Sequence, residues 1–500
     1  MARSGEPAQI IHPSVPRAAA APHGPIPRAA RRPAAPMAAA LGAACFFVYA
    51  AVGTHGTFQF EQSTYPHPVL TAHAGLSGRF HATAAELERR YIENRLARVG
   101  RILPVNATDE AVRAAYRDAK AGDLRRRGLS EPQIDARIAH YVRGAYHDWV
   151  PVNGGYVAYW PPVPALLMVP LVLWRGSGAS DILLANLVGA ATVAAVYLML
   201  RALRRHWPDL GEPATIGLTV LYGLGTVHLY QACTGQVWFL TQLCATFFLV
   251  LAIVAALRIV NHPAWVVVSG VALGLGFLSR NTIILAAPFC AWMLWTGLRG
   301  APRRGRRFVG WGAALGGVLM VAIGVQLWLN QARFGDWRDF GQGRLADAGG
   351  NPKFAADFKK YGRFSSHYLP TNLYYYFANF SLRYDHPHYP GQATFDPMGN
   401  SLFMVSPAMV FALLAWRARR RDLLWGSLIG MGPGLAALML FHGTGWYQFG
   451  HRYLLDVLPF ILLLAALGMR GRLTAIGAPL IALSLAVNAW GTYHFCIEQS

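Results

Sequence analysis

The residues of this sequence that are best suited to chemistry are single charged side chains beside apolar segments. Glu61 is the first acid after an apolar segment that ends near residue 52, and aromatic residues lie close to it in the sequence. A carboxylate at a bilayer surface suits a general base, which removes a proton from a reacting hydroxyl. The alternative interpretation of Glu61 is a solvated acid in a loop.

Two arginines and a histidine form a second group of candidates. Arg280 lies between two short apolar segments, and Arg452 precedes another one, directly after His451. Guanidinium groups donate several hydrogen bonds to a phosphate, so both arginines could bind a phosphorylated ligand. The alternatives for Arg280 are snorkelling to the membrane interface or pairing with an acid. The alternative for Arg452 is an ion pair with Asp456, four residues further along a helix.

Metal-binding and nucleotide-binding motifs are missing from the sequence. It has neither a GxxxxGK[ST] motif nor a GxGxxG turn after a strand. The five cysteines lack the spacing of a metal site. We therefore expect no metal ion and no cofactor. Cys233 and Cys496 map to the same side of the predicted membrane, and spacing alone leaves their pairing open.

The composition of the 500 residues indicates a polytopic membrane protein. Hydrophobic residues make up 54% and charged residues 14%, and the mean hydropathy is +0.29. A disordered chain would be poorer in apolar residues, and a disulfide scaffold would need more cysteines. The formal net charge is +21, but the low overall charge argues against a nucleic-acid partner. We predict an all-α fold surrounded by membrane lipids.

About eleven segments have the apolar character of membrane-spanning helices. They are residues 37–52, 182–203, 214–230, 236–257, 264–278, 283–298, 308–329, 402–416, 423–441, 453–469 and 473–490. A further apolar run at 161–174 follows two prolines and has only about 14 residues, a length that suits an interfacial helix better than a span.

Clusters of arginine predict the orientation of these helices. With a cytoplasmic N-terminus, the arginine-rich short segments all fall on the cytoplasmic side, as the positive-inside rule requires. These segments are residues 201–213, 258–262, 299–307, 417–422 and 470–472. If the run at 161–174 crossed the membrane, every later cluster would face outward, so charge favours its interfacial position. Arg280 and Arg452 then lie at the outer boundary, where the orientation rule does not explain them.

The chain divides into a tail and one membrane domain. Residues 1–36 are rich in Ala, Pro and Arg, and we expect them to form a disordered, basic, cytoplasmic tail. Residues 37–500 form the predicted membrane domain. Its two long outer loops are residues 54–160 and 330–401.

The first outer loop contains a predicted helical insertion at about residues 83–146. Thr83 with Glu86 and Ser130 with Gln133 have the spacing of helix N-termini, the first as a capping box. The loop leads into a predicted juxtamembrane helix at about 161–175.

The order of several short motifs resembles the GT-C superfamily of integral-membrane glycosyltransferases. The stretches that carry the resemblance are residues 154–167, 225–230, 274–280, 330–335, 368–374, 406–409 and 448–456. Each stretch is weakly specific, and the likeness comes from their order. Protein O-mannosyltransferases, aminoarabinose transferases and bacterial lipopolysaccharide glycosyltransferases are the nearest in layout, and bacterial mannosyltransferase-like members are the most similar.

This resemblance implies that the chain transfers a sugar, with inversion, from a polyprenyl-phosphate-linked donor to a lipid, glycan or protein acceptor. It places the chain in the bacterial inner membrane with an active site that faces the periplasm. The family's base is an acid just outside the first span, which here is Glu61, with Asp148 in reserve because many relatives carry an acidic pair. The donor phosphate would bind Arg280, Arg452 and His451. The sugar or acceptor pocket would contain Tyr65, Trp160, His228, Tyr374, Tyr375 and Trp446.

The main alternative from another functional class is a transporter or flippase for a lipid-linked glycan. Such a protein would carry charged residues at mid-membrane level and paired broken helices. Here the predicted spans are nearly free of charge and polar residues gather at one face, which favours surface chemistry. The other alternative is a non-catalytic member of the same fold, in which Glu61 has no role. One outer cavity lined by Glu61, Arg280 and Arg452 would argue against it.

Overall fold

The structure is a computed structural model that describes residues 34–104, 106–345, 352–385, 391–445 and 447–499. These residues are mostly helical, as predicted, with two short antiparallel hairpins, β1 (Trp149–Val152) with β2 (Gly155–Ala158), and β3 (Leu382–Arg383) with β4 (Thr394–Phe395). The predicted tail at 1–36 lies outside the described residues except for residues 34–36, which begin the first helix.

Five helices are long and apolar enough to cross a membrane, judged by length and composition. They are α1 (Ala34–Gly53), α7 (Asp181–Leu203), α10 (Val237–Ala256), α13 (Arg304–Phe334) and α17 (Arg421–Leu440). Each of them coincides with a predicted span. The chain is therefore compatible with a membrane protein.

The remaining apolar helices are mostly shorter than a span. They are α8 (Glu212–Leu224), α9 (His228–Thr234), α11 (Trp265–Phe277), α12 (Ala287–Gly297), α18 (Leu458–Gly468), α19 (Gly477–Gln499) and the 3-10 segment η8 (Pro407–Arg417). The predicted span at 214–230 is interrupted at Gly225, between α8 and α9. Prolines in the first turns of α12, η8 and α18 fix where these helices begin. The count of eleven spans stays a prediction.

Short elements connect the long helices and position the candidate site. They are α2 (His67–Leu76), η2 (Arg143–Tyr146), α6 (Val163–Arg175), η3 (Gly176–Gly178), η4 (Asn281–Ala286), η5 (Gln342–Arg344), α14 (Pro352–Tyr361), η6 (Ser366–Tyr368), α15 (Leu369–Leu373), η7 (Tyr374–Ala378), α16 (Leu402–Val405) and η9 (Arg452–Asp456). Helix α6 coincides with the predicted juxtamembrane helix. Its first residue, Val163, donates a backbone hydrogen bond to the carbonyl of Leu278 at the end of α11.

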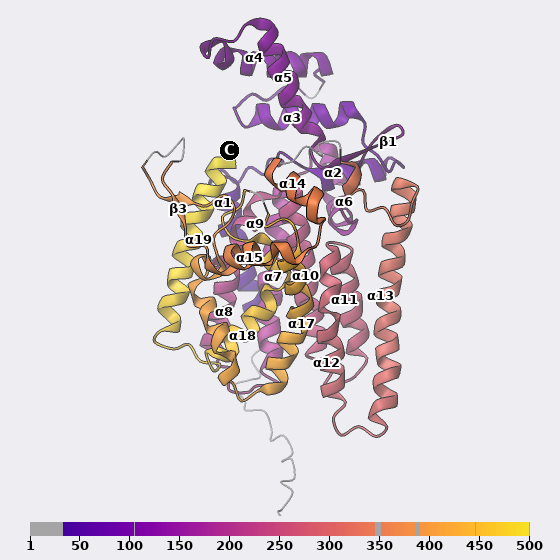
Figure 1. Cartoon of the computed structure of the whole chain (residues 1–500), viewed down its shortest axis with the longest axis vertical. Helices are drawn as coiled ribbons and strands as arrows, with labels where there is room; N and C mark the ends of the chain where they lie inside the picture. The colour runs from indigo at the N-terminus through magenta and orange to yellow at the C-terminus, as the bar shows by residue number, and fades with distance from the viewer. Residues whose placement is uncertain (1–33, 105, 346–351, 386–390, 446, 500) are drawn as a thin grey trace, which may run out of the picture.

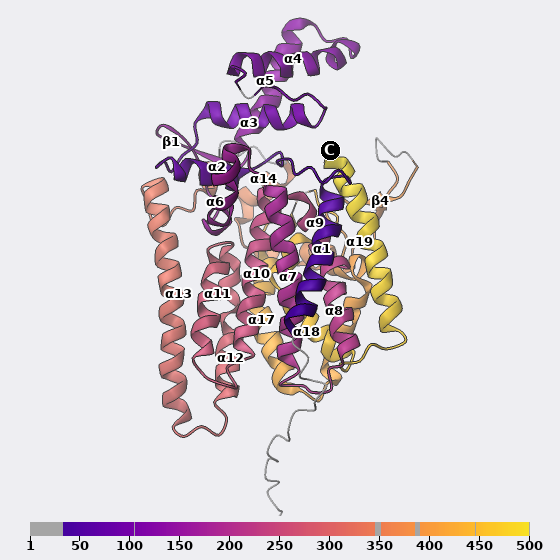
Figure 2. The same cartoon turned by 180° about the vertical axis from the view of Figure 1, so that it is seen from behind.

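Helices α7 and α10 form the centre of the bundle. Helix α7 packs against α1, α8, α9 and α10, and α10 packs against α11 as well. Helix α13 stands at one edge of the bundle, beside α11 (Figures 1 and 2). At Gly189 of α7 a Cβ atom would lie 2.8 Å from the Cβ of Ala232, so only glycine allows α7 and α9 to approach this closely.

The predicted helical insertion is present as three helices at one end of the bundle. These are α3 (Ala84–Ala97), α4 (Asp109–Arg126) and α5 (Glu131–Val142), which project beyond the membrane-sized helices (Figure 1). Their contacts bury a small apolar core that includes Ile92, Val112 and Tyr116. Salt bridges such as Arg113–Glu88 and Arg117–Asp135 join the helices at the surface.

Both predicted helix starts in the insertion are confirmed. The hydroxyl of Thr83 accepts a hydrogen bond from the Glu86 backbone N–H (3.2 Å), and the Glu86 carboxylate accepts one from the Thr83 N–H (2.7 Å). At the second start, the Gln133 side-chain oxygen accepts a hydrogen bond from the backbone N–H of Ser130 (2.9 Å). Residues three positions apart therefore satisfy the backbone donors that a helix N-terminus leaves free.

We predict that the insertion becomes less stable in acid through Glu86. Hydrogen bonds from the Arg79 guanidinium and from Thr83 lower the pKa of Glu86 to about 2. Because this value lies below the unfolded-state pKa of about 4.3, the stabilisation is complete above pH 4.3 and is lost as the pH falls towards 2. The hydrogen-exchange protection factors of residues 84–97, which correct for the intrinsic exchange rate at each pH, should therefore fall across this interval.

The matched variants are Glu86→Gln and Asp118→Asn, the second at an exposed acid of α4. Glu86→Gln should accelerate exchange at neutral pH and remove most of the acid dependence. Asp118→Asn should leave both properties as they are in the wild type. Protection factors that do not change between neutral pH and about pH 2 would contradict the prediction.

Candidate functional site

A buried ion pair joins the end of α11 to the segment before α18. The Nε of Arg280 donates to the Oδ2 of Asp456 at 2.7 Å, and the hydroxyl of Thr282 donates to the same oxygen at 2.6 Å. Only 3% of the Asp456 side chain is exposed. The two partners are 176 residues apart in the sequence, so this contact fixes how the second half of the bundle closes onto the first.

Arg452 lies beside this ion pair without a carboxylate of its own. Its guanidinium carbon stands 5.4 Å from the ring centre of Phe239 and 5.2 Å from that of Tyr453. No ion pair involves Arg452 within the part of the chain that the structure describes. The Arg452–Asp456 pair that the sequence left open as an alternative does not form, because η9 is a 3-10 segment with about three residues per turn, which turns residues four apart away from each other.

Several polar atoms around the two arginines are buried without a hydrogen-bond partner. Among the described residues these atoms include the Nε of Arg452, the Oδ1 of Asp456 and the hydroxyl of Tyr376. The ring of Tyr453 also receives the guanidinium of Arg280 at 4.8 Å. We call these five residues, Arg280, Tyr376, Arg452, Tyr453 and Asp456, the arginine cluster. Unpaired buried donors are costly, so the cluster suits an anionic ligand that would pair with them.

Asp148 belongs to the neighbourhood of the arginine cluster. It directly precedes β1, in a left-handed backbone conformation with φ of 61°, and its Oδ2 accepts a hydrogen bond from the Nε1 of Trp238 at 2.5 Å. The charges of Asp148, Arg280 and Arg452 all act on the hydroxyl of Tyr159, which lies after β2. The reserve acid is therefore the acid of the first loop that the fold brings towards the arginines.

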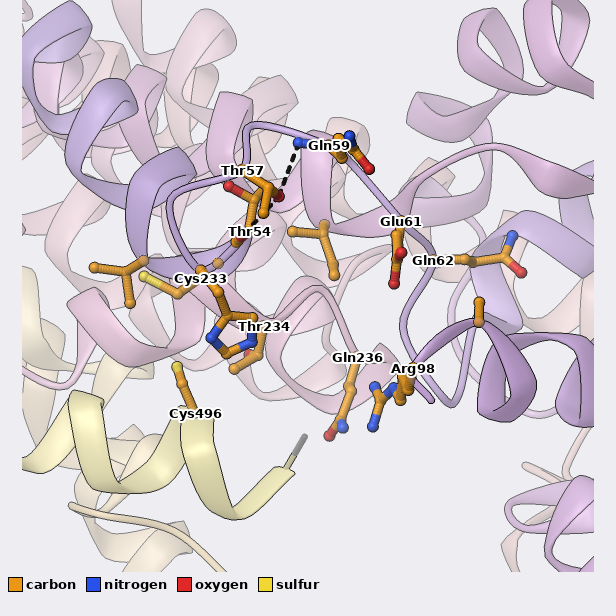
Figure 3. A pocket seen from close by; sticks show the side chains of 15 residues that line it. Thr54, Thr57, Gln59, Glu61, Gln62, Arg98, Cys233, Thr234, Gln236 and Cys496 are labelled. Carbon is orange, nitrogen blue, oxygen red and sulfur yellow. Dashed lines mark hydrogen bonds between the residues drawn. The ribbon is translucent and has the colours of Figure 1, made fainter. Parts of the chain in front are cut away.

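Glu61 lies in a separate cavity of about 250 Å³ beyond the end of α1. The cavity wall also includes Arg98, Gln236 and the thiols of Cys233 and Cys496, and neither Arg280 nor Arg452 lines it (Figure 3). The charge of Glu61 acts on Arg98, the C-terminal cap of α3. Among described residues, Glu61 has no contact with the arginine cluster, so the structure does not place the three expected residues in one cavity.

His451 contacts the arginine cluster through the ring of Tyr376. Its ring stacks on Tyr376, with centroids 4.3 Å apart, and its Nε2 and Nδ1 face the carbonyl oxygens of Gly399 (3.1 Å) and Thr444 (3.3 Å). Burial lowers the pKa of His451 to about 4, so the ring is neutral at neutral pH and has a single N–H. A carbonyl occupies that N–H, and the expected phosphate contact is therefore not available in this geometry.

Two of the expected pocket aromatics lie near Asp148. Tyr65 packs against Trp238, the donor to Asp148, with ring centres 5.1 Å apart. Trp160 stacks on Tyr159 at 4.6 Å, and its Nε1 is buried without a partner. Arg333, at the end of α13, donates to the carbonyl of Trp160 at 2.9 Å and so fixes the turn between β2 and α6.

The other expected pocket residues lie apart from one another. His228 is fully buried inside the bundle, where it contacts Tyr49 and Tyr222, and none of its described contacts is with the arginine cluster. Tyr375 approaches the ring of His451 at 6.3 Å, whereas Tyr374 is 47% exposed. Trp446 lies outside the described residues.

Five residues that the structure places at these sites were not among the candidates named from the sequence. They are Arg98, Tyr159, Trp238, Tyr376 and Tyr453. Tyr376 and Tyr453 adjoin residues that were named, so a search for buried aromatics beside arginines could have found them. No signal in the sequence links Trp238 to Asp148 or Arg98 to Glu61, because each pair joins different elements of the fold.

The described residues contain no group of three or more His, Cys, Asp or Glu side chains that could bind a metal ion. All five cysteines are free thiols. The pairing of Cys233 and Cys496, left open by the sequence, is thus absent in this structure, although both residues line the Glu61 cavity.

We predict that Asp456→Asn destabilises the protein by about 3 kcal/mol, because it leaves the Arg280 guanidinium buried without its counter-charge. Chemical unfolding in detergent measures this change. Asp422→Asn is the matched control, since the Arg420–Asp422 pair is partly exposed and is worth about 1 kcal/mol or less. The double variant Arg280→Met with Asp456→Leu should recover most of the loss. Equal effects at Asp456 and Asp422 would contradict the prediction.

Comparisons with known proteins found no match to the chain. No family model, no curated protein and no solved structure matches it. A functional conclusion therefore depends on the residues and geometry described above.

Proposed function

We propose that this chain is an integral-membrane glycosyltransferase that transfers a sugar from a polyprenyl-phosphate-linked donor to a lipid, glycan or protein acceptor. The single observation that supports this proposal best is the arginine cluster. Arg452 is 8% exposed, sits between two aromatic rings, and has no carboxylate partner among the described residues. A phosphate would supply the counter-charge and the acceptor atoms that the cluster lacks.

The position of the cluster fits a ligand that arrives from a membrane. Arg280 follows α11, whose end contacts the start of α6, and α6 in turn packs on α2 beneath the helical insertion. The cluster therefore lies at the insertion end of the apolar helices. In the proposed arrangement the chain has about eleven spans and a cytoplasmic N-terminus, and the insertion end faces the periplasm of a bacterial inner membrane.

The proposed reaction is a single displacement at the anomeric carbon. A carboxylate takes the proton of the acceptor hydroxyl, the hydroxyl oxygen forms the new glycosidic bond, and the polyprenyl phosphate leaves with the bonding electrons. Arg452 and Arg280 stabilise the negative charge that grows on the leaving phosphate. No metal ion or cofactor takes part in this proposal.

Asp148 is the better placed of the two candidate bases. Its charge and those of both arginines act on one hydroxyl, that of Tyr159, whereas the Glu61 cavity contains neither arginine. The indole of Trp238 donates to one carboxylate oxygen of Asp148 and so limits the rotation of the carboxylate. The proposal therefore gives Asp148 the role of base and leaves Glu61 as the alternative.

The first functional prediction concerns Arg452→Ala. We expect it to lower the rate of sugar transfer from a synthetic polyprenyl-phosphate donor by about 100-fold or more, because a donor to the developing charge is lost. Arg452 is a cleaner test than Arg280, whose removal would also leave Asp456 unpaired. Arg344→Ala, at an exposed arginine paired with Asp339, is the control and should transfer at the wild-type rate.

An Arg452→Ala protein that is folded and fully active would overturn the phosphate role. The same reconstituted vesicles separate the flippase alternative, because a flippase would move the labelled donor between leaflets and form no glycosidic bond. A wild-type protein that does neither would support the non-catalytic alternative.

The second functional prediction compares two isosteric variants, Asp148→Asn and Glu61→Gln. If Asp148 is the base, Asp148→Asn should lower kcat by about 100-fold to 10,000-fold, and Glu61→Gln should leave kcat within a few-fold of the wild type. The acidic limb of the pH profile should disappear in Asp148→Asn alone. The reverse outcome would return the role of base to Glu61.

A further inference from the structure

The cavity at the end of α1 is built from parts of the chain that are far apart in the sequence. The loop after α1 supplies Glu61, the end of α3 supplies Arg98, and the residue before α10 supplies Gln236. Figure 3 shows these side chains around one opening, with the two thiols on the opposite wall. The helical insertion thus contributes one wall of a cavity whose other walls belong to the bundle.

A network of hydrogen bonds holds the walls of this cavity in place. The amide nitrogen of Gln62 donates to the carbonyls of Ser177 (2.9 Å) and Ala179 (2.8 Å), and the side chain of Asn94 donates to the Gln62 oxygen (3.0 Å). Asn94 and Arg98 are four residues apart on α3, so the same face of that helix meets the loop. These bonds hold the loop beside Glu61 against the helix that ends at Arg98, and the charge of Glu61 acts on Arg98.

The chemistry of the wall indicates the class of ligand. The carboxylate of Glu61 has no hydrogen bond or ion pair with described residues, and it is the only carboxylate of the described lining, just as Arg98 is its only guanidinium. Their charges are opposite, unlike those of the arginine cluster, where a second guanidinium has no paired acid. A carboxylate accepts from hydroxyl groups and a guanidinium donates to them, so the pair matches an uncharged ligand with several hydroxyls.

We propose that this cavity is a second binding site, which takes the hydroxyl-bearing, uncharged end of the acceptor, a sugar or polyol group. Its role as acceptor site rests on the proposed function, whereas the binding itself does not. Gln236 at this cavity and Trp238 at Asp148 are two residues apart, so the start of α10 separates the two sites. In this proposal, an acceptor held by Glu61 and Arg98 extends past the start of α10 to reach the proposed base.

The test uses Cys496 as a native reporter. The other four cysteines are buried, whereas Cys496 is partly exposed and lines the cavity. The full-length protein is treated with N-ethylmaleimide, and labelling of each cysteine is followed by mass spectrometry, with Cys496→Ser as the reference. Methyl α-mannoside at ten times its dissociation constant should slow labelling of Cys496 by about tenfold.

Vesicles with or without a glycosyl diacylglycerol distinguish the two sources of such a group. Protection by the soluble glycoside indicates a free or glycan-borne sugar, and protection by the glycolipid alone indicates a lipid headgroup. Either result supports the site. Protection by inorganic phosphate instead of by the sugars would overturn it, as would the absence of any protection. If Cys496 does not react, ligand-observed NMR of methyl α-mannoside makes the same comparison.

Matched variants show whether the two charged residues make the site. Glu61→Gln and Arg98→Gln should each weaken the affinity for the sugar probe by about tenfold, the equivalent of one charged hydrogen bond. Arg101→Gln, at an exposed arginine of the same segment, should bind as the wild type does. Unchanged affinity in both cavity variants would overturn the proposal.

Failure of this inference can be told apart from failure of the proposed function. If the probe binds and its binding depends on Glu61 and Arg98, but no sugar is transferred, the site stands and the glycosyltransferase proposal fails. If transfer occurs and Arg98→Gln leaves KM for the acceptor unchanged, the function stands and the site fails. In the expected result, Arg98→Gln raises KM for the acceptor about tenfold and leaves KM for the donor unchanged.

Discussion

The buried contact between Arg280 and Asp456 is the interaction on which the arrangement of the site depends. It takes two charges out of water, which is tolerable only because Asp456 also accepts from Thr282 and because Tyr453 covers the guanidinium. The pair fixes η9 against the end of α11. Arg452, at the start of the same short segment, is thereby held between two aromatic rings, and no acid among the described residues pairs with it.

The fold of the first loop separates its two candidate bases, Asp148 and Glu61. Asp148 precedes the β1–β2 hairpin and is hydrogen-bonded by Trp238 at the start of α10. Glu61 follows α1 directly, and a hydrogen bond from the hydroxyl of Ser180 to its carbonyl holds its backbone near α7. The start of α10 stands between them. In the proposed function, Asp148 is the base near the phosphate, and the Glu61 cavity binds the acceptor.

The helical insertion takes part in this division of the site. Its capping boxes and salt bridges let it fold as a small body with its own core, and α3 then presents Asn94 and Arg98 to the loop after α1. Its attachment through Gln62 and Asn94 gives the insertion a fixed position relative to the Glu61 cavity.

The sequence by itself determined the mostly helical class, the position of the five long apolar helices, the short helix α6 and both capped starts in the insertion, because these follow from local hydropathy and spacing. It also singled out Arg280, Arg452 and Asp148. Only the tertiary structure decided that Asp456 pairs with Arg280, that His451 faces two carbonyls, and that Asp148 rather than Glu61 approaches the arginines. Most of those contacts join residues that are far apart in the chain. The packing of the helices decides which of these side chains meet, and no local sequence pattern records it.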